Sequence, residues 1–577
     1  MLLLQQSDRH CATILSGGGM GFDEQTDFVI VGSGAGSMCA GLYMRDHGHD
    51  VVLLEKSELL GGVTCKSGGV MWIPNNRFMI RDGVEESPEL AQAYVDSLTE
   101  SQRDVPGSTP QKRAAYLKQA PEMLDFLIEQ HGMPFDRVPY WPDYYDDRPG
   151  GCTTSRTVVA DLFDLKELGA WRKKVRPGFL PLPLMLADAM NLGAVKHEWS
   201  ARWMLLRFIG RLIAQIITGK RRVAAGAALQ GRALKKALDS GVDIRTDSPV
   251  TRLIVTDGRV VGVETLKDGA PWRIAARNGV LVNAGGFGKN AAMRAEYQPH
   301  TSVEWSNATD DDTGDLIQEM HSQGAALHNM DMMVGYQSTI PPGKENAYVK
   351  PGAQRMLCSP HAIMVDQSGV RYQNEGGSYV AFCRGMLDRN AQVPSVPSWG
   401  IFDARCVRKY GIAGAKRPGQ LKKWQQAGYL KVSDSIAGLA VEIGCDPEVL
   451  TTTVERFNGF VRNNHDEDFG RGNRQYDRWL GDRFNQDGPS ETLGTLEQGP
   501  FYAIPIVPGD VGTYGGVVTD EYARVLREDG SVIDGLYAAG VCTASVFGRV
   551  YPGAGASIGP AYTFAYIAAK HAAAHAQ

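Results

Sequence analysis

The chain has 577 residues, with 43% hydrophobic content and a formal net charge of -5. This length supports two or three structural units with buried cores, and the near balance of charges excludes a global attraction to nucleic acid. Nine cysteines without CxxC or CxxCH spacing argue against a disulfide framework, a zinc or other metal site and covalent haem, and favour a reducing cytoplasmic setting. Residues 1–22 lack the pattern of a signal peptide, and no window of about 18 apolar residues predicts a membrane span.

The N-terminal part predicts a dinucleotide-binding βαβ unit. Residues 27–31 form an apolar run typical of a buried parallel strand, and a second strand is expected over 50–54. A helix is expected between them, over 38–47. Glu55 ends the second strand, about 20 residues after the turn, where a carboxylate can bind ribose hydroxyls, and Lys56 follows it.

The turn between the first strand and the helix is rich in glycine. Gly32 allows a tight turn, and Gly34 lets a pyrophosphate approach the backbone at the helix N-terminus. Ser37 stands where the usual fingerprint has its third glycine. The predicted cofactor-binding residues of this turn are Gly32, Gly34, Ala35, Gly36 and Ser37.

Several later segments extend this site. A strand over 250–256 begins with Val250, a buried strand over 279–287 ends in a glycine turn, and a strand near the C-terminus ends at Gly540. The remaining expected cofactor-binding residues are Gly61, Gly62, Val63, Thr64, Ser67, Gly68, Gly69, Ala284, Gly285, Ser557 and Ile558. From Glu24 onward these segments together resemble the fumarate reductase and ketosteroid dehydrogenase superfamily of flavoproteins. The resemblance implies non-covalently bound FAD.

The resemblance also implies an α/β fold, with a Rossmann-like FAD-binding domain of the glutathione-reductase type and an inserted α+β catalytic capping domain. We expect the FAD-binding domain over 24–331 and 505–577, and the capping domain over 332–504. No second nucleotide fingerprint is evident, which favours reduction of the flavin by the organic substrate rather than by NAD(P)H.

Residues 551–560, with the sequence YPGAGASIGP, look like the signature of 3-ketosteroid Δ1-dehydrogenases. Residues 141–145, 371–379 and 468–472 match the same family in the same order, whereas Tyr514 stands where many relatives have lysine. The resemblance implies FAD-dependent 1,2-dehydrogenation of 3-ketosteroids. A membrane contact, expected below, would give access to long-tailed substrates such as cholest-4-en-3-one. Alternatives are a ketosteroid 4,5-dehydrogenase, a fumarate reductase-like enzyme and a membrane-attached flavin electron-transfer subunit. The sequence does not decide whether a quinone or another carrier accepts the electrons. It does not specify the oligomeric state either.

By the same resemblance, four residues carry the chemistry. The Tyr551 hydroxyl and the Gly555 N–H hold the ketone oxygen, and glycine at 555 is expected to leave room for the substrate. Tyr379 is the candidate base for the C2 proton, while flavin N5 accepts the C1 hydride. A free phenol has a pKa of about 10, so this base needs a hydrogen bond or a positive field. Tyr144 is the expected partner, with Tyr145 as the alternative; packed rings are the competing interpretation.

Residues 181–222 predict an amphipathic helical insertion. Arg207, Arg211 and Gln215 share one side of the helix, and leucines and isoleucines form a broad apolar side. Trp199 and Trp203 and the basic run at 220–222 flank it. This pattern favours peripheral contact of residues 196–222 with the inner face of a membrane, the alternative being a helix packed on the enzyme or on a partner subunit.

Overall fold

A mostly parallel sheet forms the centre of the fold. The computed structural model describes residues 21–99, 105–180 and 182–576, so most of the N-terminal leader considered above lies outside the described residues. The order of the six strands is β21-β22-β13-β2-β3-β9, and only β21 runs antiparallel to its neighbour. Their bounds are β2 Phe28–Val31, β3 Val51–Leu54, β9 Asp243–Arg245, β13 Val280–Val282, β21 Arg524–Leu526 and β22 Val532–Ala538.

The local predictions for this unit are confirmed to within a residue or so. Helix α1 (Ser37–Asp46) connects β2 to β3, and all four residues of each strand are buried, as a parallel sheet covered on both faces requires. The Rossmann-like α/β fold class is therefore confirmed. A four-stranded sheet of order β1-β12-β11-β10 lies next to it, with β1 Glu24–Thr26, β10 Val250–Thr256, β11 Arg259–Lys267 and β12 Ala270–Ala276.

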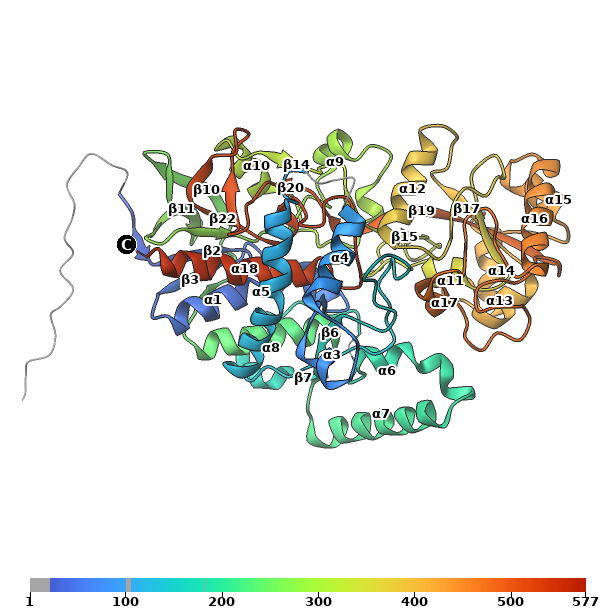
Figure 1. Ribbon diagram of the computed structural model, residues 1–577, viewed down its shortest axis with the longest axis horizontal. Coiled ribbons are helices and arrows are strands. Elements are labelled where there is room, and N and C mark those ends of the chain that lie inside the picture. The colour runs from blue at the N-terminus through green and yellow to red at the C-terminus, as the bar shows by residue number, and fades with distance from the viewer. Residues whose placement is uncertain (1–20, 100–104, 181, 577) are drawn as a thin grey trace, which may run out of the picture.

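The C-terminal segment completes the same unit. Strand β22 pairs with β13, and helix α18 (Ile558–Ala574) packs against α1 and against α5 (Pro110–Glu129), as Figure 1 shows. The contact between α1 and α18 is close at Gly36, whose φ is 88°. A Cβ atom there would lie 2.4 Å from the Ala561 carbonyl oxygen, so glycine is required.

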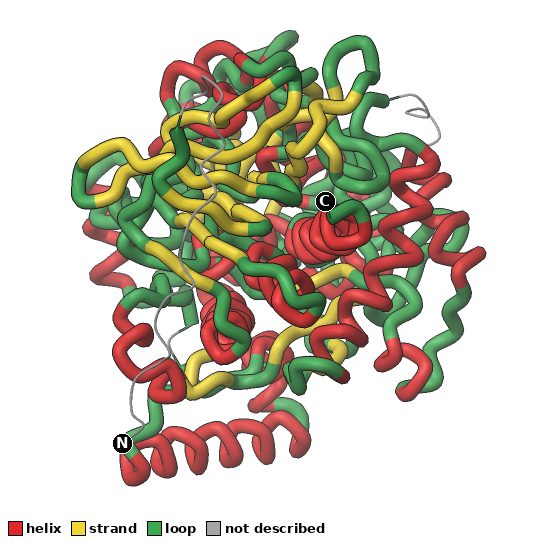
Figure 2. Tube along the Cα trace, turned by 90° about the vertical axis from the view of Figure 1, so that its left-hand side faces the viewer, coloured by secondary structure: helices red, strands yellow, loops and turns green. Residues whose placement is uncertain are grey.

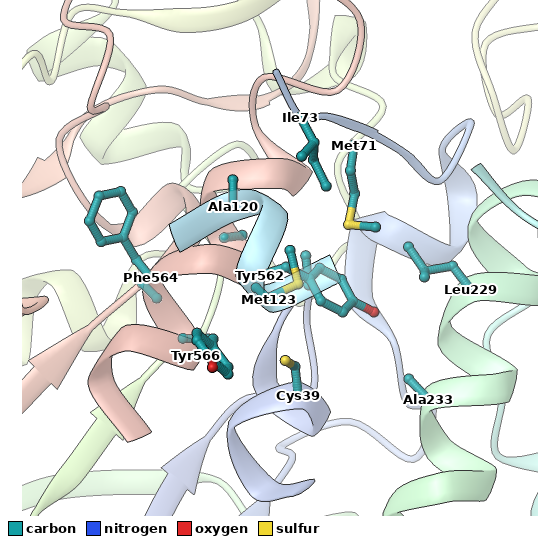
Figure 3. Close-up of a cluster of buried hydrophobic side chains, with 14 of the residues drawn as sticks. Cys39, Met71, Ile73, Ala120, Met123, Leu229, Ala233, Tyr562, Phe564 and Tyr566 are labelled. Atoms are coloured by element: carbon teal, nitrogen blue, oxygen red, sulfur yellow. The ribbon is translucent and has the colours of Figure 1, made fainter. Parts of the chain in front are cut away.

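Behind this contact lies the largest part of the apolar core. Figure 3 shows side chains from several elements meeting there, including Cys39 of α1, Met123 of α5 and Tyr562 of α18. Met71 comes from β4 (Val70–Trp72) and Leu229 from α8 (Ala225–Asp239). Strand β4 belongs to a three-stranded sheet of order β4-β6-β5, with β5 Phe135–Arg137 and β6 Thr157–Ala160.

A second body of the fold is built on a five-stranded sheet. Its path is β15-β19-β17-β16, and β18 pairs with β19. The strands are β15 Met333–Ser338, β16 Ala362–Val365, β17 Ser398–Phe402, β18 Lys431–Ser433 and β19 Phe501–Thr513. Helices around it include α11 Gln354–Cys358, α12 Tyr379–Asn390, α13 Ala404–Tyr410, α14 Pro418–Gln426, α15 Ile436–Ile443, α16 Pro447–Arg462 and α17 Gln475–Leu480. Strand β19 crosses residue 505, and the predicted domain limits stay predictions.

The expected insertion forms a helix that stands apart from the body. Helix α7 (Trp199–Thr218) lies at the lower edge in Figure 1 and again in the turned view of Figure 2. It follows α6 (Leu186–Met190) and a 3-10 turn, η3 (Leu192–Lys196). Among the described helices, none combines the length and the apolar character needed to cross a membrane.

Candidate functional site

A cavity opens at the carboxyl ends of β2, β3 and β13. It contains about 1270 Å³ of space, part of it open to solvent. Loops at the ends of parallel strands are the usual ligand site of such folds. Most of the predicted cofactor-binding residues line this cavity: Gly32, Gly34, Ala35, Glu55, Lys56, Gly62, Val63, Thr64, Ser67, Val250, Ala284, Gly285, Gly540, Ser557 and Ile558.

The remaining predicted cofactor residues do not line the cavity but hold its walls. They are Gly36, Ser37, Gly61, Gly68 and Gly69. The Ser37 hydroxyl accepts a hydrogen bond from Asn283 Nδ2 at 2.9 Å, and the Gly61 N–H donates to Ser33 Oγ at 2.8 Å. A Cβ at Gly69 would lie 2.4 Å from the Gly226 nitrogen, so this glycine lets two backbone segments pass.

The cavity suits a dinucleotide. A Cβ at Gly34 would meet no atom closer than 3.5 Å, whereas one at Gly32 would lie 2.4 Å from the Asn283 carbonyl oxygen. Gly34 thus leaves room for a pyrophosphate, and Gly32 makes the tight turn. The Glu55 carboxylate is fixed at the wall, because it accepts hydrogen bonds from Ser33 Oγ at 2.6 Å and from the Ser57 N–H at 2.9 Å.

Several lining residues were not anticipated from the sequence. Arg176 donates to Asp311 Oδ2 at 2.6 Å across the cavity, and buried Asp312 accepts from the Gly286 N–H at 2.6 Å. Burial raises the pKa of Asp312 to about 6. Val334 and Val511 bring β15 and β19 of the second sheet into the wall. These side chains belong to no motif, so only the folded chain identifies them.

The three predicted catalytic tyrosines form one cluster. The ring centroids of Tyr144 and Tyr379 are 5.3 Å apart, those of Tyr379 and Tyr551 5.4 Å, and those of Tyr144 and Tyr551 5.9 Å. Tyr476 lies 4.4 Å from Tyr144, and Tyr514 lies 5.5 Å from Tyr551. Tyrosines from distant parts of the chain thus form one aromatic cluster.

Of the two tyrosines considered at positions 144 and 145, Tyr144 is the one whose ring meets Tyr379 and Tyr551. The Tyr145 ring instead lies 5.5 Å from the guanidinium of Arg474. The Tyr144 N–H donates to the Pro552 carbonyl at 2.9 Å, which joins this loop directly to the loop that carries Tyr551.

Buried ion pairs hold the elements that carry Tyr379. This tyrosine is the first residue of α12, and the segment before it is fixed by Arg371, which pairs with Glu375 at 2.8 Å and Asp466 at 2.7 Å. Arg471 also contacts Glu375, at 3.3 Å. Each charge in this network has a partner, so Arg371 has a structural role.

Burial dominates the acidity of the cluster. The pKa of Tyr379 is raised well above 10 by desolvation, and the hydrogen bond from Tyr144 acts in the opposite direction. Desolvation likewise raises the pKa of Tyr144 and of Tyr551, and for Tyr551 the hydrogen bond with Ser557 opposes this shift. Without a further positive field, these phenols are therefore protonated at neutral pH.

Gly555 is a glycine for a different reason from the one we expected. Its φ is 96°, and a Cβ atom would lie 2.5 Å from the Val70 carbonyl oxygen of β4. The constraint thus comes from packing against β4 rather than from the substrate side. Within the described residues, no acceptor takes the Gly555 N–H, whereas its carbonyl accepts from the Trp72 N–H at 3.2 Å.

The tyrosine cluster adjoins the large cavity through the residues before α18. The Tyr551 hydroxyl lies 3.1 Å from Ser557 Oγ, and Ser557 lines the cavity. Tyr514, the departure from the expected lysine, donates through its hydroxyl to the Val550 carbonyl at 3.1 Å. One loop therefore connects the tyrosine cluster to the predicted cofactor site.

Comparisons with known proteins agree with this arrangement. A model of the FAD binding domain family matches residues 27–558. A 3-oxosteroid 1-dehydrogenase of Mycolicibacterium smegmatis is 38% identical, over 96% of this chain and 98% of its own. A 4-oxocyclohex-2-ene-1-carboxylate 5-dehydrogenase of Sinomonas cyclohexanicum is 32% identical, over 95% of this chain and 93% of its own.

A solved structure is also similar over almost the whole chain. The 3-ketosteroid Δ1-dehydrogenase of Sterolibacterium denitrificans, in complex with 1,4-androstadiene-3,17-dione, has a TM-score of 0.86. It is 32% identical and covers 96% of this chain and 100% of its own. A flavocytochrome c3 fumarate reductase shares the fold at a TM-score of 0.60 and 23% identity.

Proposed function

The chain belongs to the FAD-dependent 3-oxosteroid 1-dehydrogenase family, and we propose that it removes the C1 and C2 hydrogens of a 3-ketosteroid. In this reaction C2 loses a proton, C1 loses a hydride, and a double bond forms between them. FAD supplies the hydride acceptor at its N5 position. The observation that carries the proposal is the cluster of Tyr144, Tyr379 and Tyr551 beside the FAD cavity.

The proposed grip on the ketone uses one loop. The Tyr551 hydroxyl and the Gly555 N–H donate to the ketone oxygen, on which negative charge develops when C2 is deprotonated. Tyr551 and Gly555 are both buried, so both donors act in a medium of low polarity, and the Gly555 N–H meets no acceptor within the described residues. Such preorganised donors are among the strongest contributions to catalysis.

The proposed base is Tyr379, with Tyr144 as its hydrogen-bond partner. The pKa of Tyr379 lies well above 10, and the hydrogen bond that Tyr144 donates stabilises the charged form of Tyr379. The high pKa makes Tyr379 a strong base in the small fraction of molecules that are deprotonated. Proton transfer then depends on the ketone being held by Tyr551 and Gly555.

The substrate class is the main alternative within the family. The relatives from Sinomonas cyclohexanicum are named for single-ring oxo acids, so a small cyclic ketone is a second candidate. The higher identity to steroid dehydrogenases favours the steroid. We propose long-tailed steroids such as cholest-4-en-3-one as further substrates, because the apolar face of α7 offers a way to reach lipid.

We expect androst-4-ene-3,17-dione to bleach the flavin absorbance of the anaerobic enzyme and to yield the 1,4-diene. A 4,5-dehydrogenase would bleach with 5α-androstane-3,17-dione but not with androst-4-ene-3,17-dione, whose 4,5 bond is already unsaturated. If 4-oxocyclohexanecarboxylate bleaches the flavin and neither steroid does, the substrate is the small cyclic ketone. The flavin of an electron-transfer subunit would stay oxidised with all three compounds. Stopped-flow absorbance and mass spectrometry of the product provide the measurement.

The Tyr551→Phe variant is expected to keep its FAD and to lose about 10²–10³ in the rate of flavin bleaching, because one oxyanion donor is removed. Tyr514→Phe is the matched control, since its ring lies 5.5 Å from Tyr551 and its hydroxyl bonds the Val550 carbonyl and the Ser545 side chain, neither of which is a proposed ketone donor. Equal rates for Tyr551→Phe and the wild type would contradict the proposed grip.

For Tyr379 we expect a pH dependence. Because its pKa is raised well above 10, the reactive phenolate fraction grows up to tenfold per pH unit, and flavin bleaching should accelerate from pH 7 to pH 10. Tyr379→Phe should retain FAD, lose most of the turnover and lose this pH dependence. A variant that keeps full activity, or a wild-type rate that falls as pH rises, would show that another group is the base.

Helix α7 supports the proposal of a peripheral membrane contact. Its apolar side faces outward, with Trp199 81%, Ile216 79% and Ile217 78% exposed. Two residues of the polar side face the protein, where Arg211 pairs with Asp188 at 3.2 Å and Gln215 accepts from the Arg222 N–H at 3.1 Å, whereas Arg207 is exposed. A wide apolar face with nearby basic residues is typical of helices that lie in the interface of an anionic membrane.

We expect the protein to co-sediment with phosphatidylglycerol vesicles and less with phosphatidylcholine vesicles. Replacing Ile216 and Ile217 by glutamate should weaken this binding at least tenfold and leave bleaching by androst-4-ene-3,17-dione unchanged. Val441→Glu, at a side chain 69% exposed on α15, is the matched control. Wild-type protein that stays in the supernatant with both lipids would refute the membrane contact.

A further inference from the structure

A second, smaller cavity lies beside the FAD cavity. It contains about 360 Å³ of space, again partly open, and it surrounds the first turns of α18. Gly540, Val541, Ser557 and Ala561 line both cavities. Only the backbone turn after β22 and the beginning of α18 therefore separate the two spaces.

The side chain of Lys112 reaches into this second cavity. Lys112 belongs to the first turn of α5 and is only 2% exposed. Its Nζ donates to Thr519 Oγ1 at 2.7 Å and lies 5.2 Å from the ring centroid of Phe564. An ammonium group has three N–H donors, and the hydrogen bonds of the described residues account for one of them.

Among the residues that the structure describes, no carboxylate forms an ion pair with Lys112. Asp520 and Glu521, from the loop that carries Thr519, are the charged groups that act on it, and they do so at longer range. Tyr514 is the titratable side chain that faces it across the cavity, and burial raises the pKa of this tyrosine well above 10. From α18 the Phe564 ring faces it, and Pro560 and Ala561 line the same cavity, so the described lining residues of this helix add no charge.

Desolvation makes the charge of Lys112 easy to change. Burial lowers the pKa of this lysine to about 7, while Asp520 and Glu521 act in the opposite direction. A group with this pKa is partly protonated at neutral pH, so a modest change in the nearby field alters its proton occupancy. Negative charge that arrives in the neighbouring cavity would favour the protonated form.

We propose that Lys112 is the charge-compensating group of the FAD site, which binds a proton from solvent when the flavin is reduced. The two electrons and one proton of the hydride leave negative charge on the flavin, and the proton taken up by Lys112 balances it across the shared wall. The role is that of a positioning charge, because Lys112 touches neither the substrate nor the reacting atoms.

The test is the midpoint potential of the FAD-loaded enzyme, measured from pH 6 to pH 9 with reference dyes and without steroid. Each proton taken up with two electrons changes the equilibrium constant tenfold per pH unit, which lowers the potential by about 29.6 mV. Below pH 7 Lys112 is protonated in both states, so one proton is expected per reduction. Above pH 7 it binds a second proton, and the slope should double.

Lys112→Met should remove the break near pH 7 and leave a single one-proton slope, with a lower potential at neutral pH. Lys112→Arg carries a permanent charge and should also remove the break, but at a higher potential than the methionine variant. Lys118→Met, at an exposed lysine of the same helix, is the control and should behave as the wild type.

Two other groups near the FAD cavity titrate in this range. The pKa of Asp312, which lines the cavity, is about 6. Lys66 is the last residue of α2 (Gly62–Lys66) and lies between the lining residues Thr64 and Ser67, and its pKa is about 8. A break that persists in Lys112→Met would belong to one of them and overturn the proposal. If Lys112→Met fails to hold FAD, a persistent break in Lys112→Arg overturns it equally. Steroid turnover does not enter this measurement, so its outcome is separate from that of the proposed reaction.

Discussion

The contact between α1 and α18 at Gly36 is the constraint on which the site depends. Because a Cβ atom at Gly36 would lie 2.4 Å from the Ala561 carbonyl oxygen, the two helices can approach this closely only through a glycine. Their N-termini, from opposite ends of the chain, then lie on the same cavity, where their partial positive charges favour an anionic cofactor. The loop before α18 carries Tyr551, so the same contact also places the proposed ketone donor.

The tyrosine cluster keeps its arrangement because buried ionic networks hold it on two sides. Arg371, Glu375 and Asp466 fix the segment that leads to Tyr379. On the other side Asp143, next to Tyr144, accepts from Trp72 Nε1 at 2.7 Å and pairs with Arg156. Removing one partner from either network would leave a buried charge uncompensated, so the rings are held by interactions that are costly to break.

The sequence predicts what short-range patterns determine. The strand–turn–helix around Gly34 and the strand Val250–Thr256 have local signatures, and both are found as predicted. The cavity walls from Arg176 and Val511 follow from long-range packing and have no local signature. For Gly555 the residue type was noted but its reason was missed, because the neighbour that requires it, Val70, lies nearly five hundred positions away.

One property, low polarity, has two consequences in the proposed reaction. Burial raises the pKa of Tyr379, which makes its phenolate rare, and it strengthens the hydrogen bonds from Tyr551 and Gly555 to the ketone oxygen. These effects support each other, because a ketone whose oxygen is stabilised has a more acidic C2–H, and a phenolate of high pKa is a stronger base. Burial also lowers the pKa of Lys112 toward neutrality, so the dry interior that favours proton abstraction leaves this lysine ready to balance the resulting charge.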